Sequence, residues 1–197
     1  PFALTATLPA VPSNAYITAT VTATSSTPDS TPDNNTSSAT ATIDLRSIEA
    51  HKQAVLTLDV NNNGIGDSGD EIGYTIDVTN TGPVAIADFR LEDPVLVDSY
   101  PPPQVYADPL SNTISTTHGT VTPPFPNYYG WSMFRVSVPN FAAAAAMRVT
   151  YRARIRSDYP GTATETVNRA YLYQDLGMFG ADPLGYSELI TTPLTLL

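Results

Sequence analysis

The sequence predicts an all-β fold, an antiparallel β-sandwich with Greek-key links that is preceded by an extra pair of strands. Apolar and polar residues alternate with a period of two from residue 16 to residue 192, which is typical of half-buried strands. Clusters of Pro, Gly, Asn and Asp separate these segments at short intervals, as turns between antiparallel strands do. Only 14% of the residues are charged and threonine is abundant, which favours pleated surfaces over helices.

The strands are expected, in chain order, at residues 16–24, 39–45, 53–60, 72–80, 87–93, 131–138, 147–156, 166–173 and 187–192. The alternation is clearest in IGYTIDVTN, where Ile72, Tyr74, Ile76 and Val78 share one face. FAAAAAMR, at 141–148, has the strongest helix propensity. We expect one helical turn there and no long helix, because alternation resumes at Met147.

Two units are expected along the chain. Residues 1–46 contain a strand, a polar loop and a second strand, and a lone hairpin is marginally stable in water. They are either the end of a preceding sandwich or strands donated to a neighbour. Residues 47–197 contain a complete set of strands for one sandwich.

The loop from residue 59 to residue 71 matches the calcium-loop spacing D-x-N-x-N-G-x-x-D-x-x-D. Oxygen ligands at alternate positions of such a loop turn inward around a hard divalent cation. Strands flank the loop, so the expected role of calcium is structural. The alternative is a solvated turn rich in Asn and Gly. The candidate ligands are Asp59, Asn61, Asn63, the Ile65 carbonyl, Asp67, Asp70 and Glu71.

The run LTLDVNNNGIGDSGDEIGYTIDVTNTGPVAIADFRLEDP, residues 56–94, resembles the conserved repeat domain of bacterial and archaeal surface proteins, known as domain of unknown function eleven. VPNFAAAAAMRVTYRARI and NRAYLY resemble later parts of the same family. The resemblance implies an immunoglobulin-like sandwich in secreted or wall-attached proteins, with structural or adhesive roles and no catalysis. Two departures stand out: the alanine run replaces an expected glycine turn, and residues 174–188 replace a polar loop.

Two groups of large apolar side chains need partners. The segment 174–188 carries Met178, Phe179, Leu184 and Tyr186, which either dock on a neighbouring subunit or fold back over their own sandwich. Trp131, which follows Tyr128 and Tyr129, is expected to fill the core, with a sugar-stacking platform as the alternative.

Four of the arginines follow one face of a single predicted strand: Arg148, Arg152, Arg154 and Arg156. We expect them to pair across the sheet with acids such as Asp77, each pair contributing about 0.2–1 kcal/mol. The alternative is a basic patch for acidic glycans or for another subunit.

Lys52, near the start of the first sandwich strand, and Asn168, near the end of the fold, resemble the Lys–Asn isopeptide crosslinks of other pilus domains. Such a bond needs a buried acid, and the sequence suggests only Asp77 or Glu165. The favoured interpretation is therefore an exposed lysine and an asparagine bonded to the backbone.

Composition bounds the function. A net charge of −10 argues against nucleic acid, no cysteine is available for disulfides, and no apolar run is long enough to span a membrane. PFALTATL lacks a basic signal-peptide region and is expected to be a mature or excised end. His51 and His118 lie in no catalytic motif, so no enzyme is expected.

The expected function is a structural subunit or repeat of an extracellular filament, pilus or surface layer, stabilised by calcium and assembled by strand addition between copies. The alternatives are an adhesin or carbohydrate-binding stalk module that contacts glycans, and a non-catalytic module of a secreted hydrolase.

Overall fold

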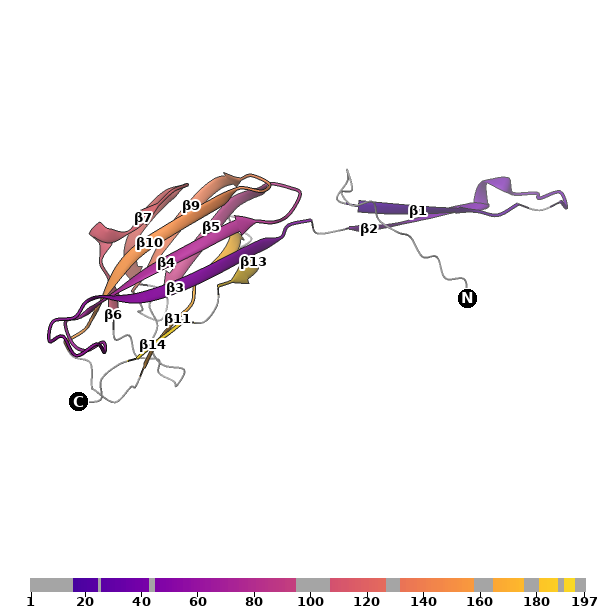
Figure 1. Cartoon of the computed structure of the whole chain (residues 1–197). Helices are drawn as coiled ribbons and strands as arrows, with labels where there is room; N and C mark the ends of the chain where they lie inside the picture. The colour runs from indigo at the N-terminus through magenta and orange to yellow at the C-terminus, as the bar shows by residue number, and fades with distance from the viewer. Residues whose placement is uncertain are drawn as a thin grey trace. The chain divides into compact units, whose positions relative to one another are not determined.

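The computed structural model describes residues 16–24, 26–42, 45–94, 107–126, 132–157, 165–175, 181–187 and 190–193 (Figure 1). Within these ranges the only helical segments are two short 3-10 turns, η1 (Pro32–Asn34) and η2 (Ser111–Thr113). The strands are β1 (Tyr16–Thr22), β2 (Thr36–Thr42), β3 (Ile48–Leu58), β4 (Glu71–Asn80), β5 (Ile86–Pro94), β6 (Ala107–Pro109), β7 (Ser115–Thr116), β8 (Thr120–Pro126), β9 (Ser132–Phe141), β10 (Ala146–Ile155), β11 (Glu165–Asn168), β12 (Tyr171–Asp175), β13 (Ala181–Tyr186) and β14 (Ile190–Pro193).

Two antiparallel sheets form the sandwich. One has the order β3-β4-β10-β6, with β7 also pairing β10, and the other has the order β13-β12-β5-β9-β8. Strands β11 and β14 pair separately, and β1 pairs β2. The predicted all-β, immunoglobulin-like antiparallel sandwich with an extra leading pair of strands is therefore confirmed.

The core lies between the two sheets, and the period-two pattern determines which side chains enter it. Along β4 the predicted apolar face is fully buried, from Ile72 to Val78. The rings of Tyr74 and Tyr151 stack with centroids 4.9 Å apart, and those of Phe89 and Phe141 stack at 5.0 Å. These aromatic pairs fill the space between the sheets with large, rigid apolar groups.

Several elements differ from the sequence prediction. The segment 166–173 divides into β11 and β12, and β6, β7, β8 and β13 were not predicted. The expected helical turn in the alanine run is wrong, because the chain makes a tight reversal between β9 and β10 instead. Ala144 takes φ 58 there, and the Ala145 N–H donates to the Ala142 carbonyl at 3.1 Å. A left-handed residue reverses the chain within a few residues, which a helical turn does not.

The chain divides into two compact units, Pro1–Leu45 and Arg46–Leu197. In the first unit β1 and β2 form a hairpin, with Tyr16 opposite Thr42 and Thr22 opposite Thr36. None of the described side chains of this unit is buried, and Val21 is 61% exposed. The core described above belongs entirely to the second unit.

Candidate functional site: an acidic loop and a buried lysine cluster

The loop between β3 and β4 turns its polar side chains toward its own backbone. The Asp59 carboxylate accepts the N–H groups of Asn63 at 3.2 Å and Gly64 at 2.7 Å. Asn61 and Asn63 donate their amide groups to Asp67 Oδ2 at 2.5 and 3.0 Å. The loop therefore brings Asp59, both asparagines and Asp67 into one network of oxygen atoms.

Asp70 anchors the network to the sandwich. It is fully buried, and its carboxylate accepts the N–H groups of Val60 at 2.8 Å and Asp67 at 2.9 Å. Ile65 donates its own N–H to Asn63 Oδ1 at 2.8 Å. Glu71 is not brought into this group, because its carboxylate oxygens accept from Arg152 and Arg154 at 2.6 Å each.

The donor set of the loop suits calcium, which prefers carboxylate, amide and carbonyl oxygens. Across the described residues, however, no three His, Cys, Asp or Glu side chains are arranged to share an ion. The loop oxygens are occupied by hydrogen bonds within the loop. A bound cation would replace some of these bonds.

The four arginines on and just after β10 form ion pairs with acids of the same chain. Arg148 lies opposite Asp77 in the β10–β4 register and forms two hydrogen bonds with its carboxylate, at 2.6 and 2.9 Å. Arg156 lies 4.0 Å from Asp108. The predicted cross-strand pairing is confirmed, and Asp77 therefore lies on the outer face of β4.

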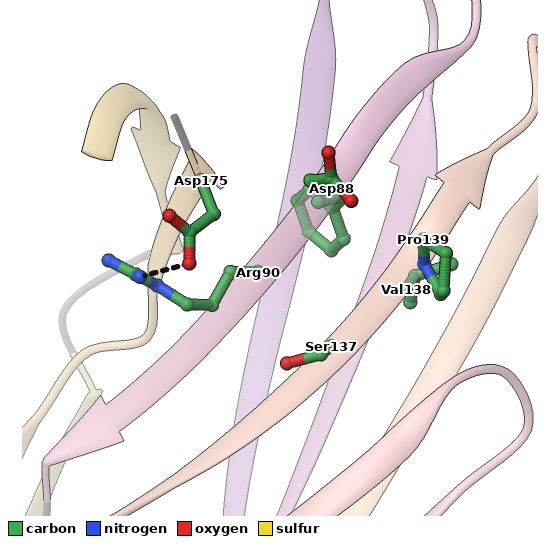
Figure 2. Close-up of a pocket in the computed structure, with 7 residues that line it drawn as sticks. Asp88, Arg90, Ser137, Val138, Pro139 and Asp175 are labelled. Carbon is green, nitrogen blue, oxygen red and sulfur yellow. Dashed lines mark hydrogen bonds and ion pairs between the residues drawn. The ribbon is translucent and has the colours of Figure 1, made fainter. Parts of the chain in front are cut away.

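An open pocket lies on the outer side of β5 and β9. Asp88, Arg90, Ser137, Val138, Pro139 and Asp175 line it together with Phe89. Figure 2 shows Arg90 reaching toward Asp175, to which it donates a hydrogen bond at 2.9 Å. Arg90 is therefore paired with Asp175, and none of the predicted site residues lies in this pocket.

Lys52 is buried, so the favoured interpretation of an exposed lysine is wrong. Its side chain has no exposed surface, and Nζ lies 2.5 Å from Asp93 Oδ2, whose side chain is also fully buried. The same nitrogen lies 4.9 Å from the centre of the Tyr74 ring and 5.6 Å from that of Tyr151. The only lysine of the chain thus sits in the core, between the two sheets.

Tyr151 connects this ion pair to Asn168. Its hydroxyl donates to Asp93 Oδ2 at 2.9 Å and accepts from Asn168 Nδ2 at 2.6 Å, and it lies 3.4 Å from Lys52 Nζ. The four residues come from β3, β5, β10 and β11. They form one cluster, hereafter the Lys52 cluster, which spans both sheets and the C-terminal strand pair.

Burial sets the electrostatics of the Lys52 cluster. It lowers the pKa of Lys52 to about 8, although the Asp93 charge opposes the change. Burial also raises the pKa of Tyr151 well above its usual value, with further contributions from Asp93 and Tyr74. Asp93 Oδ1 and Asn168 Oδ1 are buried and have no hydrogen-bond partner among the described residues. Such atoms normally find a partner, so the cluster is incompletely satisfied.

A signal for this cluster was present in the sequence. In IEAHKQAVL, Lys52 occupies the same alternating face as Ile48, Ala50 and Ala54, and that face points inward. In ADFRLED, Asp93 follows Phe89 and Leu91 with the same spacing. Asp77 is wrong as the buried acid because it lies on the outer face, and the side chain of Glu165 lies outside the described residues.

Other predicted residues fall outside the described ranges: Tyr128, Tyr129, Trp131, Met178 and Phe179. Leu184, from the same predicted insertion as Met178, lies on β13 and packs against the core of the sandwich. For this residue, folding back over its own sandwich is the observed outcome.

No protein-family profile matches the chain, and no curated protein is significantly similar to it in sequence. Its fold is similar to that of the major pilin SpaA of Corynebacterium diphtheriae, with 14% identity and a TM-score of 0.52. The match covers 75% of this chain and 39% of SpaA, whose structure points to a modular pilus assembly and stabilizing isopeptide bonds. At this identity, the similarity establishes the fold.

Two further matches have TM-scores below 0.5. The collagen-binding domain of a Staphylococcus aureus adhesin is 11% identical with a TM-score of 0.42, covering 73% of this chain and 96% of that domain. AvmM, which catalyses macrocyclization in alchivemycin A biosynthesis, is 10% identical with a TM-score of 0.47, covering 76% of this chain and 88% of AvmM. In addition, no helix in the described ranges is long and apolar enough to cross a membrane.

Proposed function

We propose that this chain is a structural module of an extracellular pilus or other surface filament, joined to its neighbours by strand addition and stabilised by calcium. The fold shared with the SpaA pilin supports this proposal, as does the resemblance of residues 56–94 to a repeat domain of surface proteins. The module has no catalytic role toward a substrate.

The hairpin of β1 and β2 carries the proposal. Among the described residues, β1 pairs only with β2, so each strand has an edge of N–H and C=O groups available to another chain. Its described side chains bury no core of their own. A two-stranded ribbon of this kind gains stability by adding to the sheet of a second copy, because main-chain hydrogen bonds then form along the open edge.

Calcium would stabilise the loop that follows β3. The ligands would be Asp59, Asn61, Asn63, the Ile65 carbonyl, Asp67 and Asp70, while Glu71 would act indirectly by pairing with two arginines beside the loop. The calcium ion would neutralise the carboxylates that the loop brings together. Asp70 would transmit this constraint to the sandwich because its backbone pairs with Ile155, at 2.9 Å from the Ile155 N–H to the Asp70 carbonyl.

The test introduces a charge on the hairpin and asks whether the full chain still associates. Val21→Lys places a cation on an exposed position of β1, and Ala143→Lys places the same charge in the exposed turn between β9 and β10. Light scattering after size exclusion and electron microscopy are compared for the two variants and the unmodified chain. We expect filaments or oligomers from the unmodified chain and from Ala143→Lys, and monomers from Val21→Lys.

Two outcomes would contradict the proposal. Association that is equal in both variants would show that the hairpin is not the contact. An unmodified chain that stays monomeric at all concentrations and binds glycans would favour the adhesin or carbohydrate-binding stalk module instead.

A further inference from the structure

The Lys52 cluster contains an amine, a primary amide and a carboxyl group in one buried site. We propose that Lys52 and Asn168 become joined by an intramolecular isopeptide bond, with Asp93 as the group that moves the protons and Tyr151 as a positioning residue. This inference rests on the cluster alone and is independent of the proposed assembly by strand addition.

The geometry places the reacting groups around shared atoms. The Tyr151 hydroxyl lies 3.4 Å from Lys52 Nζ and 2.6 Å from Asn168 Nδ2, so the amine and the amide nitrogen are separated by at most the sum of these distances, 6.0 Å. Asp93 Oδ2 contacts both Nζ, at 2.5 Å, and the same hydroxyl, at 2.9 Å. The amine, the proton carrier and the amide are thus held together before any bond forms, which removes most of the entropic barrier to their reaction.

The reaction is balanced without any external reagent. Asp93 takes a proton from the Lys52 ammonium group, and the neutral Nζ attacks Cγ of Asn168. A C–N bond forms to Nζ and the bond from Cγ to Nδ2 breaks. Asp93 delivers this proton to the departing nitrogen, which leaves as ammonia, and then takes a second proton from Nζ. The products are a neutral secondary amide, ammonia and a protonated Asp93. No oxidation or reduction takes place.

The surroundings of the cluster favour this chemistry. Tyr151 stacks on Tyr74 with centroids 4.9 Å apart and meets Phe134 edge-on at 4.7 Å, so the site is lined by aromatic rings and shielded from water. A buried ammonium–carboxylate pair is costly, and transfer of one proton converts it into an uncharged amine and an uncharged acid. The lowered pKa of Lys52 agrees with this, since the neutral amine is the nucleophile.

Two unpartnered atoms also point to the same product. Asp93 Oδ1 and Asn168 Oδ1 are both buried without a partner among the described residues. A protonated Asp93 could donate to the carbonyl oxygen of Asn168, which would stabilise the negative charge that develops there during attack. The same hydrogen bond would remain in the product and would satisfy both atoms.

The bond would join β3, the first strand of the sandwich, to β11 near its C-terminal end. The linked positions are 116 residues apart in the sequence. Tension applied to the two ends of the unit would pass through the side-chain bond and would not extend the strands between residues 52 and 168. Such a connection makes a sandwich resistant to stretching as well as to heat.

The test is the intact mass of the full chain under denaturing conditions, followed by a tryptic map. We expect a mass lower than the sequence mass by about 17 Da, the mass of one ammonia. Acylated Lys52 is not a trypsin site, so we also expect a branched peptide that joins residues 47–90 to residues 157–169. The full sequence mass, or a loss of 17 Da confined to a linear peptide, would overturn the proposal.

Two matched variants test the role of the acid. Asp93→Asn should carry the full sequence mass in at least nine molecules of ten, whereas Asp77→Asn, which changes an acid on the outer face of the same sandwich, should retain the loss. Tyr151→Phe should still form the bond but more slowly after refolding. Retention of the mass loss in Asp93→Asn would overturn the role of Asp93. The mass of the unmodified chain decides whether the bond exists, whether or not any variant folds.

Discussion

Replacing Asn168 with Ala should lower the melting temperature of the sandwich far more than the contacts of that side chain suggest. The proposed bond closes a loop of 116 residues, and a crosslink of that length stabilises the folded state by about 5 kcal/mol through the entropy of the unfolded chain. The single hydrogen bond from Asn168 to Tyr151 adds about 1 kcal/mol. The total expected loss is therefore about 6 kcal/mol.

This energy can be converted to a temperature. The second unit, Arg46–Leu197, has 152 residues. Its unfolding entropy is about 0.32 kcal/mol/K at the general value of about 2.1 cal/mol/K per residue. A loss of about 6 kcal/mol then corresponds to a decrease of about 19 °C, which differential scanning calorimetry at pH 7 would measure directly.

Asn80→Ala is the matched control. Asn80 is also fully buried, but it makes four hydrogen bonds: its amide donates to the carbonyls of Val84, Phe141 and Ala142, and its carbonyl accepts from Gly82. At about 1 kcal/mol each these are worth about 4 kcal/mol, so this variant should melt about 13 °C below the unmodified chain. If hydrogen bonds alone set the order, Asn168→Ala would be the milder change. A decrease for Asn168→Ala that is smaller than the decrease for Asn80→Ala would refute the reasoning.

Three further predictions concern pH, metal and backbone strain. As a free amine in the folded chain, Lys52 has a pKa of about 8 against a usual 10.5. In Asn168→Ala, where Lys52 stays a free amine, the unfolded state should bind more protons between these values, and stability should rise with pH across that window. The unmodified chain, with Lys52 acylated, should lack that rise, and parallel pH profiles of melting temperature would contradict the assignment. Calcium at a hundred times its dissociation constant should stabilise the folded chain by about 2.7 kcal/mol, or about 8 °C, and Asp59→Ala should abolish this effect. Identical melting curves in calcium and in EDTA would show that the loop is only a turn. Ala144→Gly should raise the melting temperature by about 2–4 °C, because Ala144 has φ 58 and glycine adopts that conformation without steric cost; a decrease would show that chain entropy outweighs the strain.

The strands were predictable because one-sided burial imposes alternation on the sequence. Along β10 the side chains from Met147 to Ile155 alternate between core and surface, as the pattern MRVTYRARI requires. The same reasoning identified the pairing of Arg148 with Asp77, because both lie on the outward face of adjacent strands. The alternation of apolar and polar residues is sufficient to predict which side chains are buried where burial depends only on the strand to which the residue belongs.

The Lys52 cluster was not predictable in full because it depends on how four strands come together. The sequence does not single out Asp93 as the buried acid, because Asp93 ends a predicted strand and precedes a proline, a context that also fits a turn. Its inward spacing after Phe89 and Leu91 is a usable signal, but only the packing of β5 over β3 brings its carboxylate to Lys52. Likewise β6 and β7 are too short for alternation to be visible, and their existence depends on the edge of β10 that they cover.

A buried ion pair is a weak source of stability, so stability alone does not explain why the only lysine of the chain lies in the core. Removing charge from water costs several kcal/mol per ion, and an apolar pair of similar volume would serve the packing at least as well. Asp93 is moreover left with one oxygen atom unpartnered, which adds to that cost. The proposed amide would remove both penalties, because its product is uncharged and its carbonyl can pair with the acid. In a chain that has no cysteine, it would also provide a covalent closure that a disulfide cannot supply. The contacts of Lys52, Asp93 and Asn168 therefore cost free energy as long as no bond joins them, and the amide removes that cost. The mass of the folded chain tests most directly whether the amide has formed.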